Sequence, residues 1–250
     1  MNLYLDIGNS RIKWKMDGMP SARVAEDLGA LAEQWQAVSV QKLETLSGCC
    51  VRGQKMMQDL DRLALRVFGR AFAWRSSLAR ACGVSNAYPE PARLGVDRWV
   101  AMLAARARCP DKPCIVVDAG TAITVDLLDA RGQHLGGTIL PGARTMLDTL
   151  DKAEQLFPDA GRDLHRLALN ASPLADNTQD AVLGGVVHAV QGGVHSVILQ
   201  QAAQIGAKIE SLSIIVTGGD APMLKLDTLN AHVVPDLVLE GLKVWMECER

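Results

Sequence analysis

A strand-turn-strand pattern that occurs twice constrains the fold of this chain more than any other feature of the sequence. Residues 114–117 form a short apolar run, residues 118–121 break it with small and turn-forming side chains, and a second apolar strand follows at once. Residues 6–13 read Asp-Ile-Gly-Asn-Ser-Arg-Ile-Lys and can be laid over residues 118–125, an offset of 118 − 6 = 112 positions. A single Asp-x-Gly sequence predicts only a hairpin turn. Two copies, each between apolar strands, indicate an internal duplication.

The residues of these turns are suited to phosphate binding. A glycine can adopt positive φ and has no side chain, so a phosphate group can approach the backbone N–H groups closely. Asp118 stands at a strand end, where a carboxylate can hold hydrated Mg²⁺ or another hard cation, and the Thr121 hydroxyl can bind phosphate. Lys13 could contact a phosphate from the strand after the first turn, or could be an ordinary solvated lysine. Two such turns could clamp a polyphosphate between two similar lobes.

Charge and composition exclude several classes of protein. The chain has 250 residues, of which 48% are hydrophobic, enough for a substantial core. Its net charge of −2 supplies no general attraction to nucleic acids or anionic membranes, so we expect neither as a direct partner. The six cysteines form no Cys-x-x-Cys pair, which argues against zinc and against a disulfide framework. The N-terminal residues lack a basic region, and polar side chains interrupt the most apolar segment, residues 186–207, so we expect a soluble, cytoplasmic protein.

Hydrophobic periodicity predicts the secondary structure of an α/β fold. Helical spacing of apolar side chains predicts helices over residues 27–38, 54–68, 93–108, 143–150, 177–205 and 236–249. Alternation and short apolar runs predict a hairpin over residues 3–16 and strands at residues 44–51, 71–74, 114–117, 133–140 and 212–216. A glycine turn at residues 217–221 should lead into a helix, residues 82–93 should form a loop, and residues 158–176 carry no clear signal. The proline-flanked link at residues 109–113 predicts a boundary between two lobes, residues 1–112 and 113–250.

The helix that begins near Arg93 places two charged residues in its first turn. Asp97 could simply stabilise the helix dipole, an effect worth roughly 0.3 to 1 kcal/mol, and Arg98 could be a surface charge. Alternatively, a carboxylate and a guanidinium side by side at the positive end of a helix are suited to a hydroxyl-bearing organic acid. The charged form of Asp97 should be favoured there, so that it could accept the proton of a substrate hydroxyl group.

The long helix predicted from Asn177 carries two glycine pairs, Gly184-Gly185 and Gly192-Gly193, on one face. Each interior glycine costs about 0.5 to 1 kcal/mol relative to alanine, so the pairs indicate that another backbone packs closely against them. Packing within the chain or a subunit interface would explain them. His188 and His195 in the same helix lack an acidic third ligand, so we do not expect them to bind a metal.

The sequence lacks the common nucleotide-binding signatures. Gly-x-x-x-x-Gly-Lys-Ser/Thr, Gly-x-Gly, His-Arg-Asp and Asp-Phe-Gly are all missing. The duplicated unit with an Asp in each turn resembles the superfamily of actin, sugar kinases and heat-shock ATPases, in which two ribonuclease-H-like lobes clamp a nucleotide. Within that superfamily the chain resembles the type III pantothenate kinases. The matching segments span nearly the whole chain: residues 6–13, 91–98, 118–122, 136–142, 177–178, 217–221 and 235–237.

This resemblance implies two duplicated ribonuclease-H-like lobes and an enzyme that uses ATP to phosphorylate pantothenate to 4'-phosphopantothenate, the first step of coenzyme A biosynthesis. It implies Mg²⁺ bound with ATP, an activating monovalent cation (K⁺ or NH₄⁺) with Asp118 as its ligand, and a homodimer. Asp97 would be the catalytic base. The residues implied to contact ATP are Asp6, Ile7, Gly8, Asn9, Ser10, Arg11, Ile12, Lys13 and Thr121. Those implied to line the pantothenate site are Tyr88, Gly95, Val96, Asp97, Arg98 and Thr178.

The sequence departs from the family pattern at residues 44–53, where a small-residue strand ending in proline is expected and Cys49-Cys50-Val51-Arg52-Gly53 is found. No residue with an implied catalytic role lies there. Two other functions stay open, because an intact fold does not guarantee turnover: an accessory factor for transcription on the same fold, or a kinase for another small hydroxy acid. The full set of Asp6, Asp97, Arg98, Asp118 and Thr121 favours an enzyme.

Overall fold

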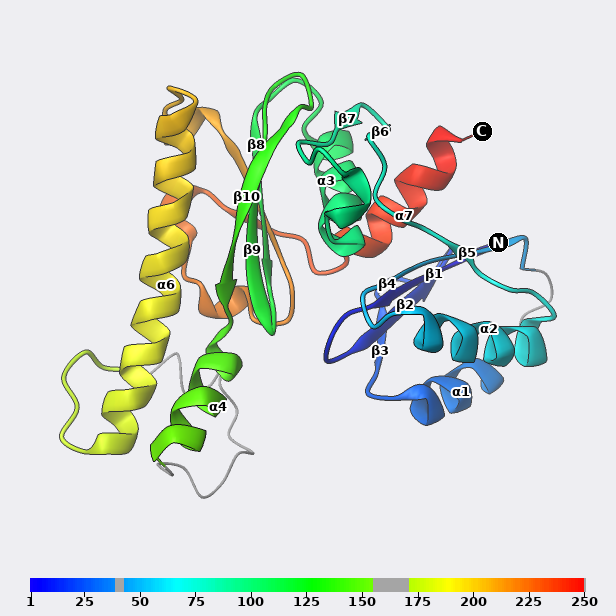
Figure 1. The fold of residues 1–250 in the computed structure, drawn as a ribbon, viewed down its shortest axis with the longest axis horizontal. Coiled ribbons are helices and arrows are strands. Elements are labelled where there is room, and N and C mark those ends of the chain that lie inside the picture. Colours follow the sequence, from blue (N-terminus) through cyan, green and yellow to red (C-terminus); the bar gives the residue numbers. More distant parts are fainter. Residues whose placement is uncertain (39–42, 155–170, 250) are drawn as a thin grey trace. The chain divides into compact units, whose positions relative to one another are not determined.

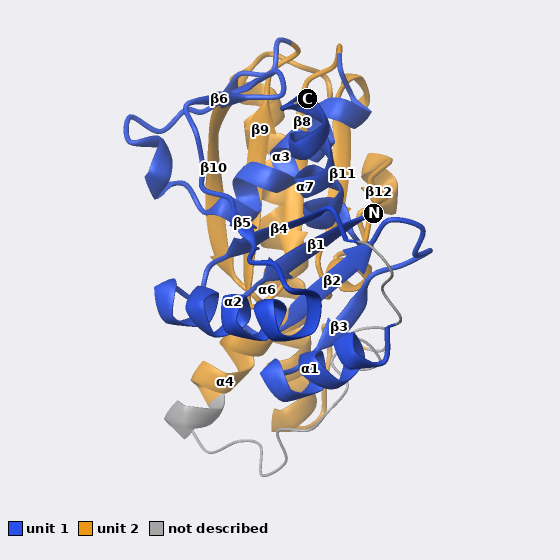
Figure 2. Cartoon of the chain, turned by 90° about the vertical axis from the view of Figure 1, so that its right-hand side faces the viewer, with its two compact units in different colours: residues 1–110, 131–134, 236–250 blue, residues 111–130, 135–235 orange. Residues whose placement is uncertain are grey.

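The computed structural model describes residues 1–38, 43–154 and 171–249, and the chain forms two compact α/β units (Figure 2). Unit 1 consists of residues 1–110, 131–134 and 236–250, and unit 2 consists of residues 111–130 and 135–235. The C-terminal segment therefore belongs to the unit that the N-terminal residues begin. The expected lobe boundary at residue 112 stays a prediction, and most of residues 158–176, which carried no clear sequence signal, lie outside the described residues.

Unit 1 is built on a five-stranded sheet with the order β3-β2-β1-β4-β5 (Figure 1). β1 (Asn2–Ile7) pairs antiparallel with β2 (Ile12–Met16), which pairs with β3 (Arg23–Ala25). On its other side β1 pairs parallel with β4 (Thr45–Cys50), and β4 pairs parallel with β5 (Ala73–Trp74). The predicted hairpin and the strand at residues 44–51 are therefore confirmed.

Helices cover both faces of this sheet. α1 (Leu28–Gln36) and α2 (Gln54–Phe68) pack on the face that holds the side chains of Leu3, Leu5 and Ile7, and Trp14 and Trp35 meet edge to face in the core between them. α7 (Leu237–Cys248) contacts β1, β2 and β4, and α3 (Val96–Arg108) contacts β4 and packs along α7. β6 (Arg80–Ala81) pairs antiparallel with β7 (Val84–Ser85), and β7 lies in residues 82–93, which were expected to form a loop.

Unit 2 repeats this architecture with the strand order β10-β9-β8-β11-β12 (Figure 1). β8 (Cys114–Ala119) pairs antiparallel with β9 (Ala122–Leu128) and parallel with β11 (Ser213–Thr217). β10 (His134–Pro141) and β12 (His232–Val233) are the edge strands. The same strand order in both units confirms the expected duplication and fold class.

α6 (Thr178–Gln204) runs alongside this sheet, and α4 (Ala143–Glu154) packs against α6 (Figure 1). Asn177 caps α6, because its side chain accepts a hydrogen bond from the Asp180 backbone N–H at 2.9 Å. By length and composition α6 could cross a membrane. However, Val186, Val190, Val194 and Ile198 lie in the core of unit 2, as in a buried helix of a soluble protein.

The two hairpin turns differ in length by one residue. Ile7 pairs with Ile12 around four residues, whereas Ala119 pairs with Ile123 around three. Positions after the turn therefore correspond at an offset of 123 − 12 = 111 rather than 112, and the partner of Lys13 in the repeat is Thr124. The ungapped overlay could not detect this deletion, because both turns are short and glycine-containing.

Short 3₁₀ helices occur at several places among the described residues: Pro91–Arg93, Ile209–Ser211, Ala221–Met223 and Asp227–Leu229. The glycine turn at residues 217–221 thus leads into a single 3₁₀ turn, where a longer helix was expected. Gly218 supplies the tight approach at this turn, since a Cβ there would overlap the Ala119 carbonyl group, and its φ is +95°.

Candidate active site

Asp6 lies near the carboxyl end of β1, in register with Lys13 on β2 and with Cys49 on β4. Paired residues on neighbouring strands point to the same face of a sheet, so these three side chains form one row. It is the face opposite Leu5 and Ile7, and hence the face of α3 and α7. The row places a carboxylate between a cation and a thiol.

Cys49 is buried, and its Sγ donates a hydrogen bond to Oδ1 of Asp6 at 3.5 Å. Burial raises the pKa of the Cys49 thiol well above its ordinary value, and the negative charges of Asp6 and Asp97 raise it further. The thiol is therefore protonated at neutral pH. Asp6 contacts Cys49 from β1, and the charge of Asp97 at the start of α3 also acts on this thiol.

Asp97 occupies the first turn of α3, and its side chain folds back over the helix terminus. Its Oδ1 accepts a hydrogen bond from the Arg98 backbone N–H at 2.8 Å. A Cβ at Gly95 would lie 2.6 Å from the same oxygen, so only glycine leaves room for this position of the carboxylate. Val96, between them, is partly buried and begins the helix.

Arg98 is a buried cation that joins the helix terminus to an aromatic pair. Its exposed fraction is only 7%, its Nη1 donates to the Tyr88 hydroxyl at 3.2 Å, and its guanidinium lies 5.9 Å from the Tyr88 ring centroid. On its other side Tyr88 stacks on the fully buried His134, with ring centroids 6.2 Å apart. The Ala87 backbone N–H points at Nδ1 of His134, at 3.5 Å. Tyr88 is thereby held between a cation and a buried ring.

The turn after β1 is closed by a hydrogen bond from the Gly8 N–H to the Arg11 carbonyl, at 3.1 Å. Asn9, Ser10 and Arg11 are exposed, as a ligand-binding turn requires. The side chains of Ile7 and Ile12 are fully buried in the core of unit 1, so these two residues can offer only main-chain groups to a ligand.

In unit 2, Asp118 occupies the position that Asp6 has in unit 1. It is in register with Thr124 on β9 and Thr217 on β11, so its carboxylate has a threonine on each side. The Thr217 hydroxyl donates to the Pro235 carbonyl at 3.3 Å and keeps its lone pairs for another partner. This row offers only oxygen ligands, the kind that hard cations prefer.

The second turn is tied to the start of α4. The Thr121 carbonyl accepts hydrogen bonds from the Gly142 N–H at 3.0 Å and from the Thr145 hydroxyl at 2.6 Å. A Cβ at Gly142 would overlap the Gly120 carbonyl group, which explains the glycine of the Pro141-Gly142 pair. The Thr121 side chain is exposed at this fixed turn.

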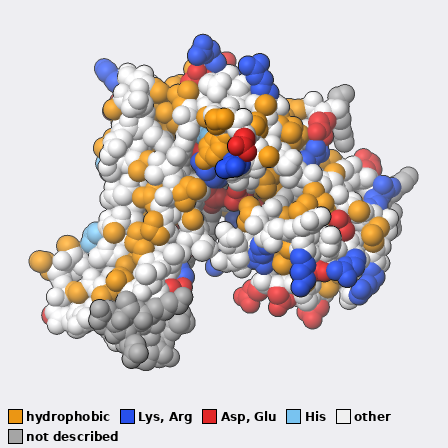
Figure 3. Space-filling model, viewed as in Figure 1, with side chains coloured by type: hydrophobic (Ala, Val, Ile, Leu, Met, Phe, Trp, Pro, Cys, Tyr) orange, Lys and Arg blue, Asp and Glu red, His pale blue; other side chains and the backbone are white. Residues whose placement is uncertain are grey.

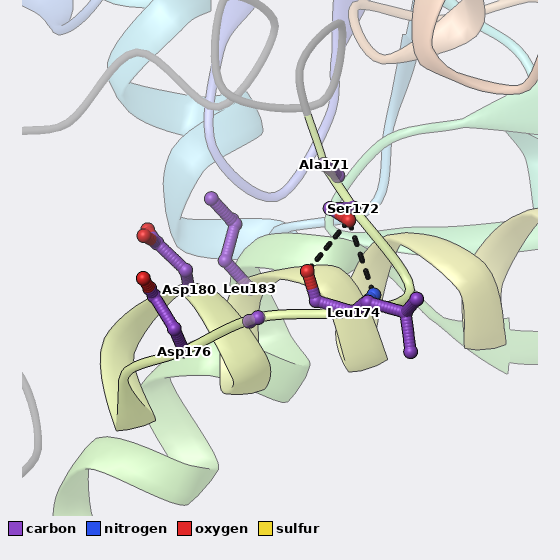
Figure 4. A pocket seen from close by; sticks show the side chains of 7 residues that line it. Ala171, Ser172, Leu174, Asp176, Asp180 and Leu183 are labelled. Carbon is purple, nitrogen blue, oxygen red and sulfur yellow. Dashed lines mark hydrogen bonds between the residues drawn. The ribbon is translucent and has the colours of Figure 1, made fainter.

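Thr178 begins α6 and is exposed. It does not line the cavity of about 430 Å³ that lies at this end of α6 (Figure 4). Asp176, Asp180 and Leu183 line this cavity together with Ser172 and neighbouring residues, and the Ser172 hydroxyl is bonded to the Leu174 backbone. Two carboxylates at its wall would repel an organic acid or a phosphate. The cavity therefore does not suit the anionic ligands expected for this protein.

Among the described residues no group of three or more His, Cys, Asp or Glu side chains could hold a metal ion. The six cysteines are all free in this structure, and Cys49 and Cys114 are buried.

The family model of the type III pantothenate kinases matches residues 2–200. The chain belongs to this family. A type III pantothenate kinase from Azoarcus sp. (strain BH72) is 37% identical over 250 residues, which cover 98% of this chain and 90% of that protein. The chain is therefore a pantothenate kinase, and the expected family and activity, the phosphorylation of pantothenate in coenzyme A biosynthesis, are confirmed.

Solved structures show the same fold at low sequence identity. A Campylobacter jejuni protein described as a Baf family transcriptional activator has a TM-score of 0.57 and 22% identity, with 98% of this chain and 97% of that one covered. The activator of 2-hydroxyisocaproyl-CoA dehydratase from Clostridium difficile, with bound ADPNP, has a TM-score of 0.57 and 12% identity, with 99% and 95% covered. At these identities the likeness shows the actin-like ATPase fold alone.

Three residues near the expected site were not found from the sequence of this pantothenate kinase. Cys49 and Arg52 lie in the segment that departs from the family pattern, and His134 opens β10. An isolated buried His or Cys has no spacing signal. For Cys49 and Arg52, the only sequence signal was that residues 49–53 depart from the family pattern. His134 had no such signal.

Proposed function

We propose that this pantothenate kinase transfers the terminal phosphoryl group of ATP to the hydroxyl group of pantothenate, with Asp97 as the catalytic base. The observation that supports this assignment is the first turn of α3, where the Asp97 carboxylate is held by the Arg98 N–H beside the buried Arg98 side chain, which also binds Tyr88. Phosphoryl transfer needs an in-line hydroxyl, neutralised phosphates and a carboxylate that accepts the hydroxyl proton. Asp97 supplies the last of these.

Arg98 and Tyr88 recognise the organic acid in this proposal. A buried guanidinium is a strong partner for a carboxylate, and Arg98 remains charged at any working pH. Tyr88, fixed between Arg98 and His134, would form one wall of the pantothenate site, and Gly95 and Val96 would form the floor at the helix terminus. Thr178 remains a proposed contact from unit 2.

ATP phosphates are proposed to bind the turn that follows Asp6, where Asn9, Ser10 and Arg11 are exposed and Lys13 stands in the row of Asp6. Ile7 and Ile12 would contribute main-chain groups only. The exposed hydroxyl of Thr121 is the corresponding proposed contact in unit 2.

Asp6 fits Mg²⁺ that is bound with ATP, and Asp118 fits a monovalent cation. A bound cation neutralises phosphate charge in this chemistry. The row of Thr124, Asp118 and Thr217 supports the second assignment, because it presents a carboxylate and two hydroxyl groups from neighbouring strands. Hard cations of low charge prefer such oxygen ligands.

The proposed homodimer uses the outer face of α6. Gly185, His188, Ala189, Gly192 and Ser196 are exposed there, and a Cβ at Gly185 or Gly192 would meet, beyond its own stretch of helix, no described atom within 4 Å. Figure 3 shows hydrophobic and uncharged side chains over α6, whereas charges of both signs gather over α1 and α2. Gly184 and Gly193 are different, because they pack within the chain against Ser172 and Leu140. We place the protein in the cytoplasm, where ATP is available.

A coupled ATP assay tests the proposal. ADP release should require pantothenate and should be faster in potassium or ammonium than in sodium or Tris buffer. Other small hydroxy acids, offered in place of pantothenate, serve as controls. Release that is independent of pantothenate would contradict the substrate assignment, and equal rates in potassium and sodium would contradict the cation assignment. An accessory role in transcription has no support beyond the fold that the Baf protein shares.

A further inference from the structure

Arg52 lies just beyond β4, beside the turn that is proposed to bind ATP phosphates. The Val51 backbone N–H donates to the Ile7 carbonyl at 3.1 Å, which extends the β1 and β4 pairing to the edge of the turn. From there the Arg52 Nε donates to the Gly8 carbonyl at 2.6 Å. This hydrogen bond is charge-assisted and short, and Arg52 is partly buried.

The bond to Gly8 fixes more than one atom. The Gly8 carbonyl and the Asn9 N–H belong to one planar peptide unit, and the chain has no cis peptide bond among its described residues. In a trans peptide the C=O and N–H groups point in opposite directions. When Arg52 holds the Gly8 oxygen toward β4, the Asn9 N–H is directed away from β4, outward from the exposed turn.

The two terminal nitrogens of Arg52 make no hydrogen bond or ion pair with the part of the chain that the structure describes. Its charge therefore stays near the turn without a carboxylate to neutralise it. At the matching place in unit 2 the segment after β11 brings Asp220 in place of an arginine, and the Asp220 backbone N–H donates to the Ala119 carbonyl at 2.9 Å. The charge is specific to the turn of unit 1.

We propose that Arg52 is a positioning residue for ATP: it aims the Asn9 N–H at the phosphates and adds a positive charge beside them. This role rests on the proposed placement of ATP at the Gly8 turn. It also explains why the segment that departs from the family pattern carries an arginine at this point.

Steady-state kinetics of Arg52→Gln and Arg52→Lys test the role, with Arg66→Gln, an exposed arginine on α2, as the matched control. Loss of a charge-assisted hydrogen bond predicts that Arg52→Gln raises the KM for ATP about tenfold and leaves the KM for pantothenate within about twofold. Arg52→Lys keeps the charge and should recover most of the loss. The difference in the KM for ATP between wild type and Arg52→Gln should also become smaller as the salt concentration is raised, because salt screens the charge of Arg52. A merely structural role would not produce this salt dependence.

An unchanged KM for ATP in folded Arg52→Gln, or equal increases in both KM values, would overturn the role of Arg52. If Arg52→Gln does not fold, the KM values of Arg52→Lys for ATP and for pantothenate test the role instead. A lysine variant that loses affinity for ATP would contradict the contribution of charge. Asp6→Asn separates this outcome from a failure of the ATP placement. If Asp6→Asn weakens ATP binding and Arg52→Gln does not, only the inference on Arg52 is wrong. If neither variant weakens ATP binding, ATP binds elsewhere and the proposed placement is wrong.

Discussion

At the scale of single residues, the position of Asp97 is set by its immediate neighbours. The Arg98 N–H holds its carboxylate, and the absence of a side chain at Gly95 leaves space for it. This contact with a first-turn N–H is compatible both with stabilisation of the helix dipole and with a chemical role. Measurement of turnover and stability in one variant separates the two accounts.

The Asp97→Asn variant should have a strongly reduced kcat, at least about a hundredfold, because the amide cannot accept the hydroxyl proton. ATP binding should be nearly unchanged, since the proposed phosphate contacts lie on the Gly8 turn. The dipole account predicts instead a loss of roughly 0.3 to 1 kcal/mol of stability and near-normal turnover. Melting temperature and kcat measured on one preparation decide between them, and a folded variant with wild-type kcat would refute the base assignment.

Arg98→Ala is the companion experiment for substrate recognition. Removal of the buried guanidinium should chiefly raise the KM for pantothenate, because the partner of the substrate carboxylate is lost. Arg93→Ala, at an exposed arginine of the same region, is the control. A large effect on the KM for ATP with none on that for pantothenate would contradict this role for Arg98.

The sequence could reveal Asp6, Asp97, Arg98 and Asp118 because each lies in a local pattern, a turn after a strand or the first turn of a helix. Cys49 and His134 could not be found in this way. Their significance depends on contacts across the sheet or across 47 positions of chain, from Ala87 to His134, and only the folded structure defines those contacts.

At the scale of elements, strong periodicity was a reliable guide. The alternation in β1 and β2 and the amphipathic spacing of α2 (Gln54–Phe68) gave the correct types and nearly the correct limits. Short elements were harder to predict. β6 and β7 contain two residues each, and the 3₁₀ turn at Ala221–Met223 is set by Gly218 packing on β8, which leaves no periodic pattern.

The close crossing of α3 and α7 provides a test at this scale. A Cβ at Gly241 would overlap the Val100 carbonyl group, so Gly241→Ala should force the helices apart and lower the stability by about 1 to 3 kcal/mol. Because α3 carries Asp97 and Arg98, kcat should fall as well. Lys243→Ala, on the exposed side of the same helix, is the control for helix propensity. Equal melting temperatures for Gly241→Ala and wild type would contradict this packing argument.

At the scale of the whole molecule, the exposed face of α6 predicts self-association. Light scattering at micromolar concentration should give a dimer, and Gly192→Arg should give a monomer, because a charged side chain would enter the proposed interface. Leu65→Arg places the same charge on the exposed face of α2 and should leave the dimer intact. A wild-type monomer, or a dimer that survives Gly192→Arg, would exclude this face as the interface.

The duplicated architecture could be predicted because the same turn occurs twice in the sequence. Which of the two units the last helix, α7, belongs to could not be predicted. A proline-flanked link suggested a single cut, whereas α7 packs on β1, β2 and β4 and so belongs with the first strands of the chain. No local signal in residues 236–249 shows which of two similar sheets the helix will cover.

The position of α7 affects how the chain must mature on the ribosome. Leu237, Leu242 and Trp245 are buried in unit 1, yet they are synthesised after every strand of both sheets. At about 5 to 20 residues per second, the first sheet waits roughly ten seconds or more before α7 can cover its second face, the one that carries Asp6 and Cys49. The unit that starts first is thus completed last, and nascent chains that terminate early would expose the face that normally receives α7.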